Sequence, residues 1–247
     1  MDSNKRDARL RFIFRLASIE RLLPMLLLLT LPAVVVNAQF TFTTNDDGSL
    51  NIVGYTGQSG AVVIPSTTNG YPITGIIETR SGGAFTFLTS LTNIMIPNSV
   101  TNIMQEPFKG CINLTTITVD ALNSSYSSIS GVFFDKSQTT LLEYPEGKAG
   151  SYIIPDSVTN IGTFAFDNCT GLTNVTILNS VISIGEFAFQ SCTRLTNITI
   201  PSSVANIGYD AFFDCTSLIS VFFNSNTPAL ADLIAFDADN NVTVYYL

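Results

Sequence analysis

Four cysteines are the residues of this 247-residue chain whose type and spacing could do chemistry. Cys169, Cys192 and Cys215 follow one another at intervals of 23 residues, and Cys111 lies further upstream. An exported chain with four cysteines suggests disulfides, and cysteines on adjacent parallel strands would lie within bridging distance. Disulfides are therefore one possibility. Leu88 fills the same position of an earlier repeat, which indicates a site for an apolar side chain of modest size. We therefore favour buried free thiols packed as small hydrophobic groups.

The sequence offers few other groups for catalysis or metal binding. It contains no histidine and no Cys-x-x-Cys pair, which argues against zinc sites and against Ser-His-Asp or Cys-His catalysis. Carboxylate pairs are left as acid-base groups, and we interpret them as turn and surface residues because nothing predicts a cleft around them. These pairs are Asp46 with Asp47, Glu143 with Glu146, and Asp210 with Asp214. We expect no enzymatic activity and no cofactor.

The segment Asp237-Ala238-Asp239-Asn240-Asn241 is similar to the opening of a calcium-binding loop. Such loops carry glycine at the sixth position, where the backbone turns sharply. Val242 occupies that position here, so we expect no metal site.

The cysteine spacing is one column of a longer repeat. VTNIGTFAFDNCTGLTNVTI begins at Val158 and is followed, at 23-residue intervals, by VISIGEFAFQSCTRLTNITI and VANIGYDAFFDCTSLISVFF. Gly162, Phe166 and Leu172 each recur in this register. A fixed period of this length is typical of a solenoid, in which each coil buries its apolar face only against neighbouring coils.

Earlier coils can be traced backwards in the same columns. Residues 84–91 align with residues 165–172, and residues 107–111 are the next copy. In that copy Met104 stands in the glycine column and Pro107 in the alanine column. These two departures predict a distorted coil.

An enlarged coil is inserted between Cys111 and Cys169, at about residues 120–150. It contains two apolar segments, 131–134 and 139–144, separated by the polar residues 135–138. This pattern predicts a hairpin that projects from the stack.

Each repeat predicts an outward strand face. In the pattern Leu172-x-x-Val175-x-Ile177 the three apolar side chains point inward, and alternation sends the residues between them to solvent. The exposed side of the stacked strands is therefore the candidate for binding.

A second short strand and a corner complete the repeat. We expect Gly162 at this corner to adopt a positive φ angle, which glycine does without a Cβ clash. The residues that follow, Phe164-Ala165-Phe166, are predicted to form a tight helical turn.

Residues 1–38 predict a signal peptide. Six basic residues precede an apolar run at 22–36, and Val36-Asn37-Ala38 has the small-x-small form of a cleavage site. A transmembrane anchor is the alternative, but the run has only 15 residues and two prolines, whereas a span needs roughly 20 residues. We predict export and cleavage before Gln39, with no membrane span left afterwards.

Removal of this leader makes the chain strongly acidic. Six of the 11 basic residues and three of the 19 acidic residues lie in it, which leaves 5 basic and 16 acidic residues. Nucleic acid is excluded as a partner because phosphate binding needs a basic patch.

Residues 39–63 predict an N-terminal capping hairpin. Two strands, 40–44 and 49–55, flank the turn sequence Asn45-Asp46-Asp47-Gly48. Because the end of a solenoid exposes unpaired strand edges, an atypical first unit is expected as a cap.

The repeat resembles the leucine-rich repeats of the BspA type, whose unit reads Leu-x-x-Ile-x-Ile-Pro-x-Ser-Val-x-x-Ile-Gly-x-x-Ala-Phe-x-x-Cys. The segment LTNITIPSSVANIG from Leu195 and the segment AFFDC from Ala211 carry this likeness. It implies a β-rich solenoid at residues 64–247, a leucine-rich-repeat superhelix with a parallel strand ladder and short helical turns. It also implies a non-enzymatic secreted or cell-surface module for adhesion and protein binding.

A protein ligand is expected on the outward columns of the strand ladder, and a glycan is the alternative, although the chain has no tryptophan to stack on sugars. Stacked coils make these columns a broad polar sheet with apolar spots, suited to an extended or protein surface. The predicted face consists of Asn93, Met95, Thr116, Thr118, Ile153, Asn174, Thr176, Asn197, Thr199, Ser220 and Phe222.

Overall fold

The computed structural model of the chain describes residues 39–57, 60–79, 82–224, 233–236 and 242–247. All the repeats lie in one compact unit, Phe42–Leu247. The predicted signal peptide and the calcium-like segment 237–241 lie outside the described residues.

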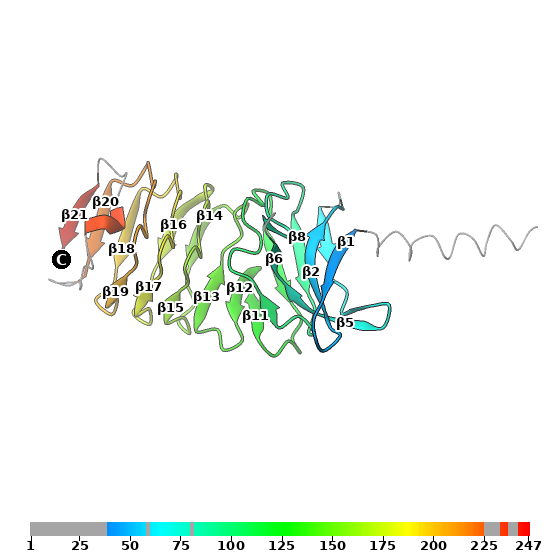
Figure 1. Cartoon of the computed structure of the whole chain (residues 1–247). Helices are drawn as coiled ribbons and strands as arrows, with labels where there is room; N and C mark the ends of the chain where they lie inside the picture. The colour runs from blue at the N-terminus through cyan, green and yellow to red at the C-terminus, as the bar shows by residue number, and fades with distance from the viewer. Residues whose placement is uncertain (1–38, 58–59, 80–81, 225–232, 237–241) are drawn as a thin grey trace, which may run out of the picture. The chain divides into compact units, whose positions relative to one another are not determined.

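One series of parallel strands, which we call ladder 1, carries the predicted binding face (Figure 1). Its backbone pairing falls into three groups, β3-β8-β10, β14-β16 and β18-β20-β21. The strands are β3 (Ala61–Val63), β8 (Asn93–Ile96), β10 (Thr116–Val119), β14 (Gly150–Ile153), β16 (Leu172–Thr176), β18 (Asn197–Ile200), β20 (Ser220–Phe223) and β21 (Thr243–Tyr246).

A second parallel series, ladder 2, pairs within two groups, β2-β5-β9 and β13-β15-β17-β19. The strands are β2 (Leu50–Tyr55), β5 (Tyr71–Ile76), β9 (Asn102–Ile103), β13 (Thr140–Glu143), β15 (Asn160–Ile161), β17 (Ser183–Ile184) and β19 (Asn206–Ile207). The two ladders make the predicted β-rich solenoid, which is confirmed.

The remaining elements lie outside the two ladders. They are β1 (Phe40–Thr44), β4 (Thr67–Thr68), β6 (Glu78–Thr79), β7 (Gly82–Gly83), β11 (Tyr126–Ile129), β12 (Val132–Asp135) and the 3-10 helix η1 (Leu233–Phe236). The turn between β1 and β2 is closed by a hydrogen bond from the N–H of Gly48 to the carbonyl of Asn45 at 3.0 Å. Gly48 has a φ angle of 83°, which glycine tolerates.

The enlarged coil is an antiparallel meander of β11, β12 and β13. The predicted hairpin corresponds to β12 and β13, and β11 was not predicted. The hairpin does not project from the stack, because Val132, Phe133 and Phe134 are buried and β13 pairs with β15 in ladder 2. Val132 and Phe134 belong to the core cluster, whereas the ring of Phe133 packs against Tyr126 with centroids 5.1 Å apart.

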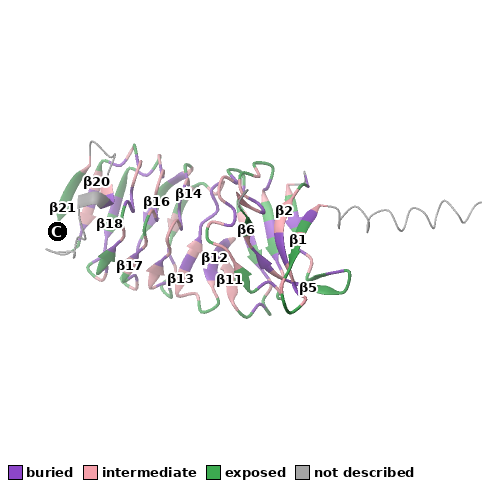
Figure 2. Ribbon diagram, in the orientation of Figure 1, coloured by how far each residue is buried: buried purple, intermediate pink, exposed green. Residues whose placement is uncertain are grey.

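The core contains equivalent apolar residues of successive coils, and Figure 2 shows that buried residues recur from coil to coil. The phenylalanine column is the clearest case. Ring centroids lie 4.7 Å apart between Phe166 and Phe189 and 5.1 Å apart between Phe189 and Phe212, with interplanar angles of 8° and 1°. This spacing is close to the distance between paired strands, so the backbone register fixes the aromatic stack.

The predicted helical turn at the corner is wrong. Phe164 and Asn168 have φ angles of 60° and 54°, which lie outside the right-handed helical region. Phe164, Phe166 and Asn168 donate their N–H groups at 2.7 to 3.1 Å to the carbonyls of Glu186, Ala188 and Gln190 in the next coil. These bonds between coils alternate with local bonds from the N–H groups of Ala165 and Asp167 to the carbonyls of Gly162 and Phe164 at 3.2 and 3.0 Å, so the corner is a series of turns and lacks the continuous local bonding of a helix.

The expected positive φ angle at the corner glycine is also wrong. Gly162, Gly185 and Gly208 have negative or extended φ, and left-handed residues occur two positions later instead. A Cβ atom on Gly185 would lie 2.6 Å from the backbone nitrogen of Thr163 in the preceding coil. The glycine column is therefore required for close contact between backbones.

The four cysteines are free and fully buried, as expected. Their Sγ atoms lie 2.9 to 3.5 Å from backbone carbonyl oxygens of the preceding coil, those of Phe85, Tyr144, Phe166 and Phe189. Each thiol can therefore donate a weak hydrogen bond within the core. Burial also raises the pKa of Cys111 to about 12, so little reactive thiolate forms at neutral pH.

Truncation in the aromatic stack should be costly. Phe189→Ala should lower the free energy of unfolding by about 3 to 5 kcal/mol, because it leaves a cavity in the core. Chemical denaturation measures the change. Phe87→Ala is the control, since Phe87 is 71% exposed and its truncation should cost far less; an unchanged stability for Phe189→Ala would contradict the packing register.

A thiol count tests the cysteine column. Four thiols should react with a chromogenic disulfide reagent when the unreduced chain is denatured, and almost none should react in the folded chain, because burial excludes the reagent. Two or fewer thiols in the denatured chain would indicate disulfides.

Candidate functional site

The eleven residues of the predicted binding face lie on ladder 1, and none of them is buried. In the strand register, Thr118 pairs with Met95, Ile153 with Thr176, and Thr199 with Phe222. Asn93 and Thr116 form one such pair in the other outward column, and Asn197 and Ser220 form another. The fold thus arranges these side chains in two columns, which are interrupted between β10 and β14 and between β16 and β18 where pairing stops.

The outward columns extend beyond the residues that the sequence analysis selected. Val63 pairs with Met95 at one end and is 64% exposed, and Tyr245 pairs with Phe222 at the other. The rings of Phe222 and Tyr245 stack at 4.9 Å. The period alone did not identify these two positions, because β3 and β21 lie in coils whose sequences depart from the repeat.

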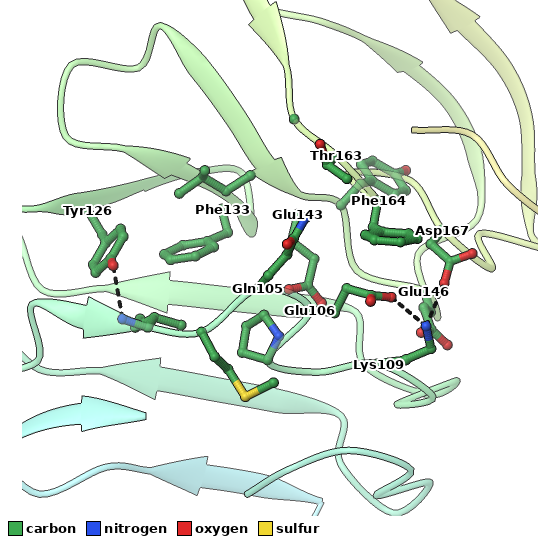
Figure 3. Close-up of a pocket in the computed structure, with 16 residues that line it drawn as sticks. Gln105, Glu106, Lys109, Tyr126, Phe133, Glu143, Glu146, Thr163, Phe164 and Asp167 are labelled. Carbon is green, nitrogen blue, oxygen red and sulfur yellow. Dashed lines mark hydrogen bonds and ion pairs between the residues drawn. The ribbon is translucent and has the colours of Figure 1, made fainter. Parts of the chain in front are cut away.

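A pocket of about 320 Å³ lies beside the distorted coil predicted from Met104 and Pro107 (Figure 3). Within the described residues, β9 has no strand partner on the side of the enlarged coil. The N–H of Ile103 instead donates to the hydroxyl of Tyr126 on β11 at 3.0 Å. The pocket occupies this break in ladder 2.

Carboxylates line the pocket, which corrects the expectation that the acidic pairs are surface residues. Glu143 and Glu146 are 8% and 7% exposed, and Asp167 is 6% exposed. Asp210, outside the pocket, is also buried, whereas Asp46 and Asp47 are exposed in their turn as expected. The alternation of β13 places Glu143 on the same inward side as Leu141, a signal that was present in the sequence.

These carboxylates have few hydrogen-bond partners. Glu146 accepts the N–H of Gly110 at 2.6 Å, and Asp167 accepts an N–H of the Asn168 side chain at 2.8 Å. Oε2 of Glu143, Oε2 of Glu146 and Oδ1 of Asp167 are buried without a partner. Such atoms are costly when they carry charge.

Lys109 supplies a cation at one side of the cluster. Its Nζ lies 2.7 Å from Glu106 and 3.8 Å from Asp167, and 5.2 Å from the centre of the Phe164 ring. The same ammonium group therefore makes an ion pair, a longer-range attraction and a cation–π contact. Figure 3 shows Lys109 beside Glu106 and Asp167.

Burial shifts the protonation of all three buried carboxylates. It raises the pKa of Glu143 well above its ordinary value, and the charge of Glu146 adds to this. It raises the pKa of Glu146 to about 7 although the Gly110 N–H opposes the shift. It raises the pKa of Asp167 to about 6 against the attraction of Lys109.

The stability of the chain should fall as the pH rises from about 5 to about 8. In this pH range Glu146 and Asp167 still hold protons in the folded chain, whereas they have released them in the unfolded chain. Unfolding therefore releases protons and is favoured at higher pH. We expect a loss of about 1 to 2 kcal/mol, since one pKa unit corresponds to about 1.4 kcal/mol and solvent at the pocket rim reduces the effect.

Thermal unfolding followed by circular dichroism tests this dependence. Glu146→Gln should flatten it because the amide does not ionise, and Glu186→Gln, at an exposed position, should retain it. Equal slopes for Glu146→Gln and the unaltered chain would refute the assignment.

Two kinds of site are absent from the described residues. No group of histidine, cysteine and acidic side chains there is arranged to hold a metal ion, and no helix in that part of the chain is long and apolar enough to cross a membrane.

Solved structures with a similar fold are leucine-rich repeat proteins of bacteria. One from Eubacterium ventriosum ATCC 27560 is 22% identical with a TM-score of 0.54, over 77% of this chain and 72% of that one. The pneumococcal vaccine antigen PcpA is 16% identical with a TM-score of 0.52, over 84% and 86%. These likenesses support the fold alone.

A leucine rich cell surface protein from Faecalibacterium prausnitzii A2-165 is 18% identical, with a TM-score of 0.43 over 84% of this chain and 93% of that one. No curated protein matches the sequence. The model of the BspA type Leucine rich repeat region, in contrast, matches residues 78–150 and 144–234 with six copies. Because these matches span more than half of the chain, the chain belongs to the BspA-type leucine-rich repeat family.

Proposed function

We propose that the chain is a non-enzymatic, secreted or cell-surface module that binds a protein partner through the outward columns of ladder 1. The observation that carries this proposal is the chemistry of those columns. Every paired outward position from β3 to β21 is uncharged, although the chain has 19 acidic residues. A partner can cover such a surface without desolvating a charge.

The arrangement of side chains also suits a protein surface. Threonine and asparagine hydroxyl and amide groups project beside exposed apolar groups such as Ile153, which is 65% exposed, and Met95, which is 40% exposed. Protein–protein interfaces likewise combine apolar contacts with hydrogen bonds. The exported location rests on the predicted signal peptide and on family membership.

A glycan ligand is the second candidate. The stacked rings of Phe222 and Tyr245 lie at one end of the outward columns, and Tyr245 is 43% exposed. An aromatic surface of this kind can pack against a sugar ring. The two candidates differ in where binding is centred, since the central threonine residues matter for a protein partner and the aromatic pair matters for a glycan.

Charge introduced into the centre of the face should weaken binding of a protein partner. The partner is first captured with the purified chain from surface proteins and identified, and its affinity is then measured by surface plasmon resonance. Thr176→Glu and Thr199→Glu should each weaken binding at least about tenfold, because a carboxylate would be buried without a partner.

Asn206→Glu on ladder 2 is the matched control, because Asn206 is exposed on another side of the coil. Equal affinity for all three variants, with unchanged melting temperatures, would remove ladder 1 from consideration. Binding on a glycan array that is lost in Tyr245→Ala but kept in Thr176→Glu would favour the glycan candidate.

A further inference from the structure

The acidic pocket holds more carboxyl groups than its own cation can pair with. Lys109 approaches Glu106 and Asp167, whereas no cation among the described residues lies within ion-pair distance of Glu143 or Glu146. Glu143 has a buried Oε2 without a hydrogen-bond partner and lines the pocket. A buried carboxylate left in this way is one that an incoming positive group would stabilise.

The chain itself shows how the pocket accommodates a positive group. Lys109 places its ammonium between carboxylates and against the face of Phe164. Beside Glu143 the lining also provides aromatic rings. Phe133 pairs with Glu143 in the strand register, its ring centroid lies 5.1 Å from that of Tyr126 with an interplanar angle of 40°, and both rings line the pocket. Figure 3 shows these rings on the side of the pocket opposite Lys109.

The volume and the lining favour an organic cation over a metal ion. The pocket measures about 320 Å³, at the lower end of the range of about 300 to 1,000 Å³ for small-molecule sites. Aromatic and aliphatic side chains form much of the wall, and the described carboxylates are not arranged as a metal-binding group. An alkylammonium or guanidinium group has an apolar stem that can use this wall.

We propose that the pocket is a binding site for an alkylammonium or guanidinium group, held by Glu143 and Glu146 with its apolar stem against Phe133 and Tyr126. The group comes either from a free amine or from a lysine or arginine side chain of a partner. The site is independent of the proposed function, because none of the outward residues of ladder 1 lines it.

Binding of this cation is coupled to proton release. The carboxylates must ionise to attract it, and the pocket's charged and titratable groups are Glu106, Lys109, Tyr126, Glu143, Tyr144, Glu146 and Asp167, with the thiols of Cys111 and Cys169 nearby. Burial raises the pKa of Glu146 to about 7. Affinity should therefore increase at least about tenfold from about pH 5.5 to about pH 8, because the competent ionised form becomes the major one.

Isothermal titration calorimetry with defined probes tests the site. The full chain is titrated with n-butylammonium and n-butylguanidinium, with n-butanol as the neutral control and with calcium chloride as the metal control. Both organic cations should bind at least about tenfold more tightly than n-butanol, and the heat should depend on the buffer's ionisation enthalpy in the sense of proton release. Glu143→Gln and Glu146→Gln should each weaken binding at least tenfold.

Glu186→Gln is the matched control and should bind as the unaltered chain does. Thermal melts check that each variant is folded. Glu146→Gln should be at least as stable at about pH 8, because burial raises the pKa of Glu146 only to about 7 and the variant removes its buried charge. A peptide with one lysine and its acetylated form distinguish the sources: selective binding of the unmodified peptide indicates a protein side chain, and binding of 1,5-diaminopentane alone indicates a free amine.

Several results would overturn the proposal. These are equal binding of n-butanol and the cations, binding of calcium alone, unaltered affinity in both glutamine variants, and no binding of any organic cation at about pH 8.

Discussion

Each coil of this protein pairs its strands with, and buries its apolar side against, the coils above and below it. Equivalent residues must therefore lie one strand spacing apart, which sets the 4.7 Å distance between the rings of Phe166 and Phe189. The glycine column makes this spacing possible, since a side chain at Gly185 would collide with the backbone of Thr163. The hydrogen bonds that the buried thiols and the corner residues donate to neighbouring coils depend on the same close approach of backbones.

The acidic pocket lies where this stacking of coils is interrupted. Met104 replaces the column glycine, and the meander of β11, β12 and β13 enters the next coil. The backbones no longer meet along ladder 2 at this point, and the pocket occupies the space. A repeat protein thus gains a pocket where its sequence departs from the repeat, because regular coils pack their interior side chains against one another.

The two candidate surfaces differ in charge, and this separates their roles. The outward columns are uncharged and suit a partner that covers them through hydrogen bonds and apolar contacts. The pocket concentrates carboxylates that burial holds partly protonated, so its charge responds to pH near neutrality. Such a site weakens the fold at higher pH.

The sequence by itself determined the solenoid, the inward columns and the direction of residues such as Thr176 and Thr199, because period and alternation act locally in every coil. Only the tertiary structure decided the left-handed corner at Phe164, the reason for Gly162 and the burial of Glu146. Those features depend on hydrogen bonds and contacts between coils. The residue pattern within one repeat does not show which atoms of the neighbouring coil will contact it.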